Sequence, residues 1–185
     1  MKMKKLFLTL FAALFAAAGF GQPFVLTVDG FRDCKDNTKD YIVVQVPDVD
    51  QATLFQRAKN YFTKIYNSPQ KVMSESGAEM ISVFGAENIR YPAARATCEF
   101  SYKLICEFKD GRCKIAPIWV DFFGAGHSFP IRSAGGITPP GIYRKNGEVR
   151  DVNTKSRIEA VIFPIVDGLE KALKNESTQA KSEDW

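Results

Sequence analysis

The amino-acid sequence predicts an α+β fold in which a single antiparallel β-sheet of about five strands carries two helices on one face. One observation is a long alternation of apolar and polar residues over 98–121, interrupted by Asp110-Gly111. Another is that apolar residues recur at helical spacing in 54–65 and again in 158–173. Because each helix has one apolar stripe and the alternating stretch has one apolar face, the simplest arrangement packs both helices on that face.

The alternating stretch predicts a hairpin with arms 98–108 and 112–121. Asp-Gly between two such runs favours a type I′ turn, which needs positive φ at both central residues. With Asp110-Gly111 as the turn, the expected cross-strand pairs are Phe108 with Cys113, Glu107 with Lys114, Cys106 with Ile115 and Leu104 with Pro117. The apolar face then collects Phe100, Tyr102, Leu104, Cys106, Phe108, Cys113, Ile115 and Trp119. The other face is charged near the turn, at Lys103, Glu107, Arg112 and Lys114, and becomes apolar at Ile118 and Val120.

Two strands and a helix are predicted ahead of the hairpin. The strands are 23–28 and 41–46, separated by a polar surface loop, and the β-branched composition of the second predicts that it is well buried. Asp48 and Gln51 have the spacing of a helix-capping pair, and Pro69 ends the helix that follows. The apolar stripe of this helix is Leu54, Ala58, Tyr61, Phe62 and Ile65.

The remaining elements are a short hairpin, a long loop region and a C-terminal helix. Residues 71–75 and 78–84 are predicted to pair around Ser76-Gly77, and 85–96 to form an irregular connection. Glycine and proline crowd 124–153, which predicts loop with at most brief strand around Ile142 and Val149. The C-terminal helix is predicted over 154–174, with a capping box from Ser156 to Glu159, a kink or split at Pro164, and a disordered tail over 175–185.

The N-terminus, residues 1–21, has the three parts of a secretory signal peptide. A basic start is followed by an uncharged apolar run, Leu6 to Phe20, and by small residues. The run is shorter than the ~20 residues that span a bilayer. We therefore expect export to the periplasm or the medium, with a chain that is not membrane-spanning after signal cleavage, in which residues 22–40 form an N-terminal strand and loop and 41–174 the domain.

Charge and cysteine content limit the function further. The formal net charge is +4, but Lys2, Lys4 and Lys5 leave with the signal, so the remaining chain is close to neutral and a nucleic-acid partner is not expected. Four cysteines, Cys34, Cys98, Cys106 and Cys113, allow three disulfide pairings, and the sequence does not choose among them. The last three fall on the predicted core face, where some are expected to stay reduced.

Several segments of the sequence resemble one family of bacterial proteins. They are the strand 41–47, the helix that runs through Leu54-Phe55 and Tyr61-Phe62 to Tyr66-Asn67-Ser68-Pro69, and the hairpin stretch from Tyr102 to Arg112. The family consists of exported bacterial domains of unknown function with a TATA-binding-protein-like (TBP-like) fold. The resemblance covers roughly 40–121 and implies that fold, whereas it brings no catalytic residue with it.

No catalytic, cofactor-binding or metal-binding residue is assigned from the sequence, and no cofactor is expected. His127 is the only histidine, which excludes a histidine-rich metal site. A Cys–His nucleophile pair would need an exposed thiolate, whereas the nearby cysteines alternate into the core. Gly124 to Ser128 does not open a helix, so it is not a phosphate-binding loop. Glu107 is expected to pair with Lys114 across the strands.

The sequence therefore favours a non-enzymatic module that binds a protein or small ligand in the cell envelope. The binding surface is expected on the uncovered sheet face or the 124–147 loops, because a rigid scaffold commonly presents its binding groups on loops. The candidate residues are Lys103, Ile105, Lys114, Ile118, Val120 and His127. The alternatives are an enzyme of unrecognised type, with its active residues in the same loops, and a purely structural or assembly role.

Overall fold

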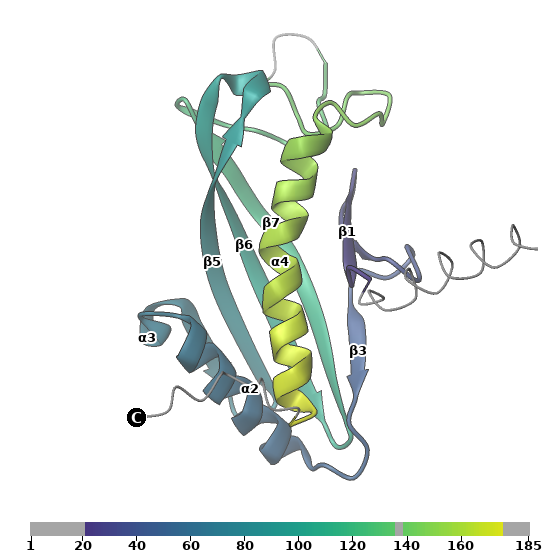
Figure 1. Ribbon diagram of the computed structural model, residues 1–185, viewed down its shortest axis with the longest axis vertical. Coiled ribbons are helices and arrows are strands. Elements are labelled where there is room, and N and C mark those ends of the chain that lie inside the picture. The colour runs from purple at the N-terminus through teal and green to yellow at the C-terminus, as the bar shows by residue number, and fades with distance from the viewer. Residues whose placement is uncertain (1–20, 136–138, 176–185) are drawn as a thin grey trace, which may run out of the picture.

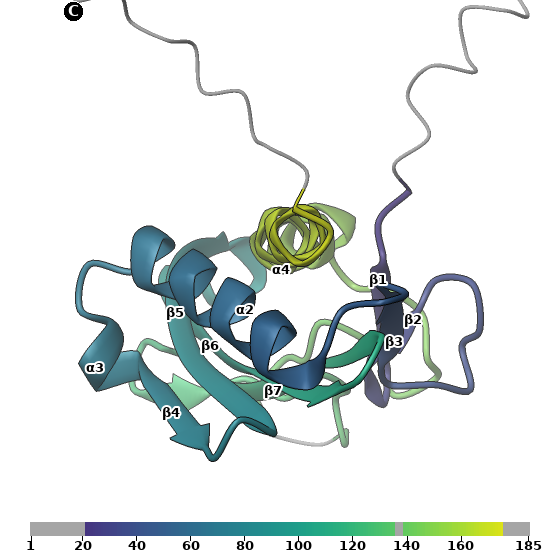
Figure 2. The same cartoon turned by 90° about the horizontal axis from the view of Figure 1, so that it is seen from below.

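A computed structural model describes residues 21–135 and 139–175, so most of the predicted signal peptide and tail lie outside the described residues. The α+β class is confirmed: a twisted antiparallel sheet carries two long helices on one face (Figures 1 and 2). The sheet is larger than predicted, with six strands in the order β3-β7-β6-β5-β4 and β8 added to β7. Its strands are β3 (Ile42–Gln45), β4 (Met73–Ser76), β5 (Met80–Tyr91), β6 (Ala96–Lys109), β7 (Arg112–Gly124) and β8 (His127–Ser128). The helical elements are α2 (Gln51–Ile65), α3 (Pro69–Val72), the 3-10 turn η1 (Pro92–Ala94) and α4 (Val152–Leu173).

The register predicted for the long hairpin is confirmed by β6 and β7. All four predicted pairs are present, from Phe108 with Cys113 to Leu104 with Pro117. The turn type is different, because Gly111 has positive φ and Asp110 does not. Contacts with the segment before α2 hold this turn: the Asp110 carboxylate accepts the Gln51 N–H at 2.8 Å, and the Gly111 N–H donates to the carbonyl of Val49 at 2.8 Å.

Strand β5 is longer than the sequence predicts. It continues through Gly85 to Tyr91 and pairs with β6 along its whole length, where an irregular connection was expected. Gly85 does not end the strand, because the ring of its partner Tyr102 fills the space above it. At the other end of this hairpin, α3 occupies 69–72, so β4 begins at Met73 rather than at residue 71.

Helix α2 packs on the sheet through a stripe that differs slightly from the predicted one. Its N-cap is Asp50, whose carboxylate accepts the Thr53 N–H, and Asp48 stands before it with φ of +62°. Leu54, Ala58 and Phe62 are buried as predicted, and so is Phe55, which packs edge-on against Phe108. Ile65 is 41% exposed. Its expected inward place is taken by Tyr66, whose hydroxyl shares a hydrogen bond with that of Tyr102.

Helix α4 begins at Val152 and crosses the sheet beside α2. Asp151 caps it by accepting the Thr154 N–H and hydroxyl, so the predicted box at 156–159 is wrong. Pro164 does not split the helix. Close packing between the helices depends on Gly168, because a Cβ there would collide with the ring of Tyr61.

A separate two-stranded hairpin, β1 (Phe24–Thr27) and β2 (Gly30–Asp33), packs against α4 through β1. The sequence predicted the first strand but a polar loop in place of the second. Glu159 of α4 is buried, accepts the N–H of Leu26 at 2.8 Å and pairs with Lys155. The hydroxyl of Tyr143 donates to the carbonyl of Leu26. The hairpin is therefore fixed by polar contacts as well as by its buried apolar residues.

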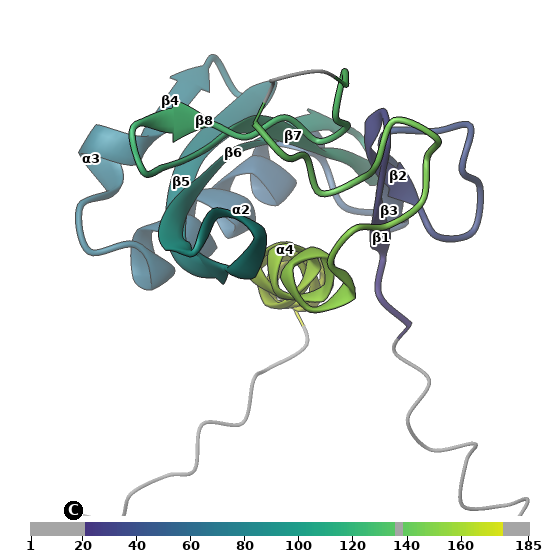
Figure 3. The same ribbon diagram turned by 90° about the horizontal axis from the view of Figure 1, so that it is seen from above.

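The segment after β7 closes the end of the core that lies far from α2 (Figures 1 and 3). Phe129 and Ile142 are buried, and the Tyr91 hydroxyl donates to the carbonyls of Pro140 and Gly141, at 2.9 Å each. Apart from β8, the only strand pairing in the described part of this segment is two isolated bridges at Tyr143. None of the helices within the described part of the chain is both long enough and apolar enough to cross a lipid bilayer.

Candidate functional site

The candidate site is the face of the six-stranded sheet opposite α2 and α4, which we call the open face. Figure 3 shows both helices on one side of the sheet, with the other side free of helix. Alternation along the strands assigns to the open face a set of residues from β3, β5, β6 and β7, namely Val43, Phe84, Lys103, Ile105, Glu107, Lys109, Arg112, Lys114, Ile118 and Phe123. Val120 joins them at an irregularity in the pairing of β7 with β6.

Exposed apolar side chains concentrate on this face. Seven large hydrophobic residues are exposed in the described part of the chain, and five of them are Val43, Phe84, Ile118, Val120 and Phe123. The register makes three positions neighbours, because Lys103 pairs with Ile118 on one side and with Phe84 on the other. Exposed apolar groups gathered on one face indicate a contact surface, whereas single ones scattered over a protein do not.

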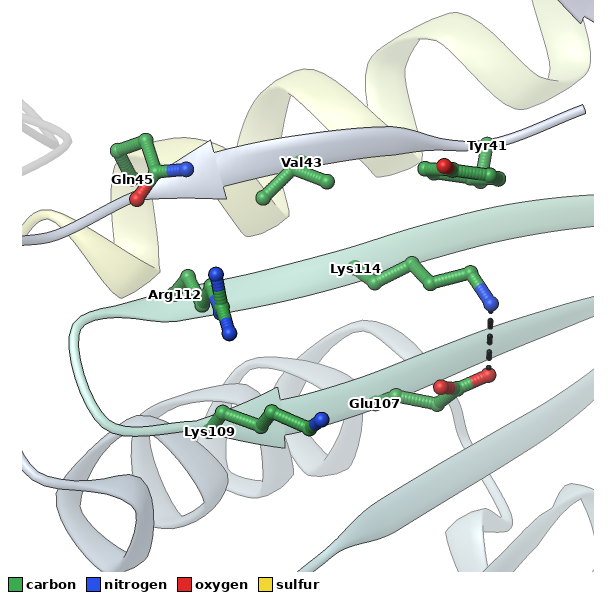
Figure 4. A pocket seen from close by; sticks show the side chains of 7 residues that line it. All are labelled: Tyr41, Val43, Gln45, Glu107, Lys109, Arg112 and Lys114. Carbon is green, nitrogen blue, oxygen red and sulfur yellow. Dashed lines mark hydrogen bonds and ion pairs between the residues drawn. The ribbon is translucent and has the colours of Figure 1, made fainter. Parts of the chain in front are cut away.

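The end of the open face nearest the Asp110-Gly111 turn forms a cationic cleft of 330 Å³ (Figure 4). It is lined by Tyr41, Val43, Gln45, Glu107, Lys109, Arg112 and Lys114. Lys114 lies 3.1 Å from Glu107, and its ammonium group stands 4.9 Å from the centre of the Tyr41 ring. Lys109 and Arg112 pair across the hairpin, and neither has a carboxylate partner among the described residues. The cleft therefore presents an excess of positive charge beside apolar surface.

The structure brings most of the predicted binding residues together. Lys103, Ile105, Lys114, Ile118 and Val120 share the open face, and Lys114 also lines the cationic cleft. His127 is exposed on β8, opposite Gly124, which ends β7, whereas the cleft lies at the start of β7.

Sequence reasoning missed part of the site because it treated β3 as a buried strand. Instead β3 lies at an edge of the sheet, so Val43 and Gln45 are exposed and Tyr41 is half-buried. The period-2 alternation of 41–46 would have placed these three on one face. Phe84 had no such local signal, because its position depends on the pairing of β5 with β6.

Three of the four cysteines lie on the sheet face that the helices cover. Cys98, Cys106 and Cys113 are buried free thiols and Cys34 is exposed. Burial raises the pKa of the Cys98 and Cys106 thiols, and Cys98 fills the space beside Gly124. These thiols therefore do not form a reactive pair with exposed His127. Among the described residues, no cluster of histidine, cysteine and acidic side chains has the arrangement of a metal site.

Comparison with one solved structure supports the fold. A DUF4468 family protein from Bacteroides ovatus matches with 14% identity and a TM-score of 0.51, over 76% of this chain and 87% of that chain. A TBP-like protein from Parabacteroides distasonis matches with 12% identity and a TM-score of 0.48, over 70% of this chain and 90% of that chain. No curated protein matches the sequence.

The family resemblance rests on the segment that contains β3, α2, the hairpin of β4 with β5, and most of the long hairpin. This segment supplies four of the open-face strands and the helix opposite them. Residues 41–116 match the model of the family described as a domain of unknown function (DUF4468) with TBP-like fold, which confirms the resemblance predicted from the sequence.

Proposed function

We propose that this chain is an exported, non-enzymatic binding module whose open face holds a segment of a partner protein with apolar and acidic side chains. The observation that carries the proposal is the position of five of the seven exposed large hydrophobic residues of the described chain on one sheet face. The basic and apolar residues at the N-terminus support the export part of the proposal.

The charge distribution supports the acidic character of the partner. Lys109 and Arg112 have no acidic neighbour in the cleft other than Glu107, which is already paired with Lys114. Carboxylates on a bound segment would complement the two free cations, and arginine is suited to bind a carboxylate with two parallel hydrogen bonds. The adjacent row of Ile118, Lys103 and Phe84 offers apolar contacts for the same segment.

A protein segment fits this face better than a nucleic acid does. Val120 and Phe123 extend the apolar surface away from the cationic cleft, and Glu99 faces the same side as Phe123 in the register. A backbone of phosphates would meet this carboxylate and the apolar row instead of a continuous basic stripe. The open face thus combines an apolar surface with a cationic cleft at one end. An amphipathic peptide segment with apolar and acidic side chains complements such a surface.

The proposal is tested by selecting random peptides for binding to the purified chain and then measuring the affinity of one selected peptide. We expect the selected peptides to be enriched in acidic and large apolar residues. Arg112→Glu and Ile118→Asp should each weaken binding by about tenfold or more, because they remove a charge complement and an apolar contact, respectively.

Ile65→Asp provides the matched control, because Ile65 and Ile118 are exposed to 41% and 42%, and Ile65 lies on α2 rather than on the sheet. This variant should bind the peptide like the unmodified chain. Equal affinity of the Arg112→Glu and Ile118→Asp variants and the unmodified chain, or selected peptides without acidic enrichment, would overturn the proposal.

A further inference from the structure

A second cleft, of 490 Å³, lies between the end of β5 and the first turns of α4. It is lined by Arg90, Pro92, Asn153, Thr154, Ser156, Arg157 and Ala160. None of these residues belongs to the cationic cleft of the open face, and none is acidic. The volume is within the range of small-ligand sites, which is roughly 300–1,000 Å³.

Two arginines from different elements line this cleft. Arg90 comes from β5 and Arg157 from α4, and both are exposed. Neither forms a salt bridge or a side-chain hydrogen bond with another residue in the described part of the chain, in contrast to Arg57, whose guanidinium donates to the carbonyl of Leu173. Two unpaired guanidinium groups in one concave surface produce a local field that attracts anions.

Two uncharged polar side chains of the same lining add donors. Asn153 and Ser156 line the cleft, and their side chains have no hydrogen-bond partner among the described residues. The backbone N–H groups at the N-terminus of α4 do not form the site by themselves. The Asp151 carboxylate already accepts the N–H and hydroxyl of Thr154 there. The cleft is therefore defined by four side chains with free donors and by the absence of a carboxylate from its lining.

We propose that this cleft binds a phosphate monoester, held by Arg90 and Arg157, with Asn153 and Ser156 as additional donors. The planar guanidinium presents paired N–H groups that match the oxygens of a phosphate, and two such groups balance its two negative charges. The cationic cleft of the open face fits this ligand less well, because Glu107 stands in its lining. This inference is independent of the proposed peptide site, since the two share no residue.

The test is a calorimetric titration of the purified chain with inorganic phosphate, with succinate titrated separately as the carboxylate probe. We expect phosphate to bind and Arg90→Ala and Arg157→Ala each to weaken binding by about tenfold or more. Arg157→Lys should recover only part of the loss, because a lysine keeps the charge but loses the paired N–H groups. Both arginines are exposed, so the melting temperature of each variant should match that of the unmodified chain.

Arg112→Ala is the control that separates the two clefts, and it should leave phosphate binding unchanged. Loss of phosphate binding in Arg112→Ala but not in Arg157→Ala would overturn the inference by placing the anion on the open face. Binding of succinate without phosphate, or no binding of either, would also overturn it. Flotation with vesicles of phosphatidylcholine, with and without phosphatidic acid, distinguishes the source. Arg157-dependent binding to the acidic vesicles supports a lipid headgroup, and phosphate binding without vesicle binding supports a soluble monoester.

Discussion

The ring of Tyr102 in β6 lies over Gly85, its partner in β5, in the space where any other residue would place a Cβ. The hydroxyl of the same tyrosine stands 3.2 Å from that of Tyr66, just beyond the end of α2. Burial raises the pKa of the Tyr102 hydroxyl, which therefore stays protonated and available for this hydrogen bond. One side chain thus joins two neighbouring strands to the helix that covers them.

Gly85→Ala should lower the free energy of unfolding by about 1–3 kcal/mol, because the new methyl group would displace the Tyr102 ring from a well-packed position. Chemical denaturation measures this change. Ala86→Val, at the next and exposed position, is the control and should change stability by about 0.5 kcal/mol or less. A Gly85→Ala variant as stable as the unmodified chain would show that the ring does not occupy this space.

The same pair of residues explains why the sequence predicted one hairpin and missed the extent of the other. The register of β6 and β7 follows from local signals, since the Asp110-Gly111 turn lies between two alternating runs. Gly85 interrupts the alternation of β5, and its compatibility with a strand depends on a residue 17 positions away, Tyr102. Pairing of that kind carries no local signal, so 85–96 read as a connection.

The predicted boundaries of α2 were wrong for a similar reason. Asp48 and Asp50 are equally good caps by composition, but the Asp110 carboxylate accepts the Gln51 N–H and fixes the helix to begin there. At the other end, Ile65 and Tyr66 are adjacent apolar residues. Tyr66 is the one that contacts the sheet, through the hydrogen bond between its hydroxyl and that of Tyr102.

Glu159→Ala should be strongly destabilising, by about 3 kcal/mol, because it leaves the Lys155 ammonium and the Leu26 N–H without their acceptor. Glu159 is only 6% exposed, so these contacts are largely shielded from solvent in the folded chain. Denaturation by urea, with amide exchange at Leu26 as a local probe, measures the effect. Glu170→Ala breaks a more exposed ion pair of α4, with Lys174, and should cost about 1 kcal/mol or less. Equal losses from the two variants would contradict the role assigned to Glu159.

The thiols should react in two classes. Cys34 is exposed, whereas Cys98, Cys106 and Cys113 are buried in the core. Burial raises the pKa of the Cys34 thiol as well as those of Cys98 and Cys106, so access of the reagent to the sulfur separates the two classes. Titration of the folded chain with a thiol reagent should therefore modify Cys34 first, and the other three only after unfolding. Failure of the unfolded, unreduced chain to expose the additional thiols would indicate disulfides instead.

Two isoleucines of β7 test which face of the sheet is covered by the helices. Ile115 is fully buried and Ile118 is 42% exposed on the open face. Ile115→Ala should lower the free energy of unfolding by about 2–5 kcal/mol, the usual cost of a core truncation. Ile118→Ala should change it by about 0.5 kcal/mol or less. The reverse order would mean that the sheet presents its other face to the helices.

Only the part of the candidate site that lies on the long hairpin, β6 and β7, was predictable from the sequence. Lys103, Lys114 and Ile118 followed from alternation about a known turn, because side chains on a strand change face at every residue. Phe84 and Val43 joined the face through the pairing of β5 and β3 with that hairpin. No local sequence pattern indicates the chemical nature of a partner. It is inferred from the assembled surface and its charge.

The most direct test of the open face as a binding surface is the affinity of a selected acidic peptide for Ile118→Ala, compared with Ile65→Ala. Both substitutions remove a similarly exposed isoleucine, and only the first lies on the open face. We predict that Ile118→Ala weakens peptide binding by about tenfold with no loss of stability, while Ile65→Ala binds like the unmodified chain. Unchanged affinity in Ile118→Ala, or an equal loss in both variants, would contradict the assignment of the open face as the binding surface.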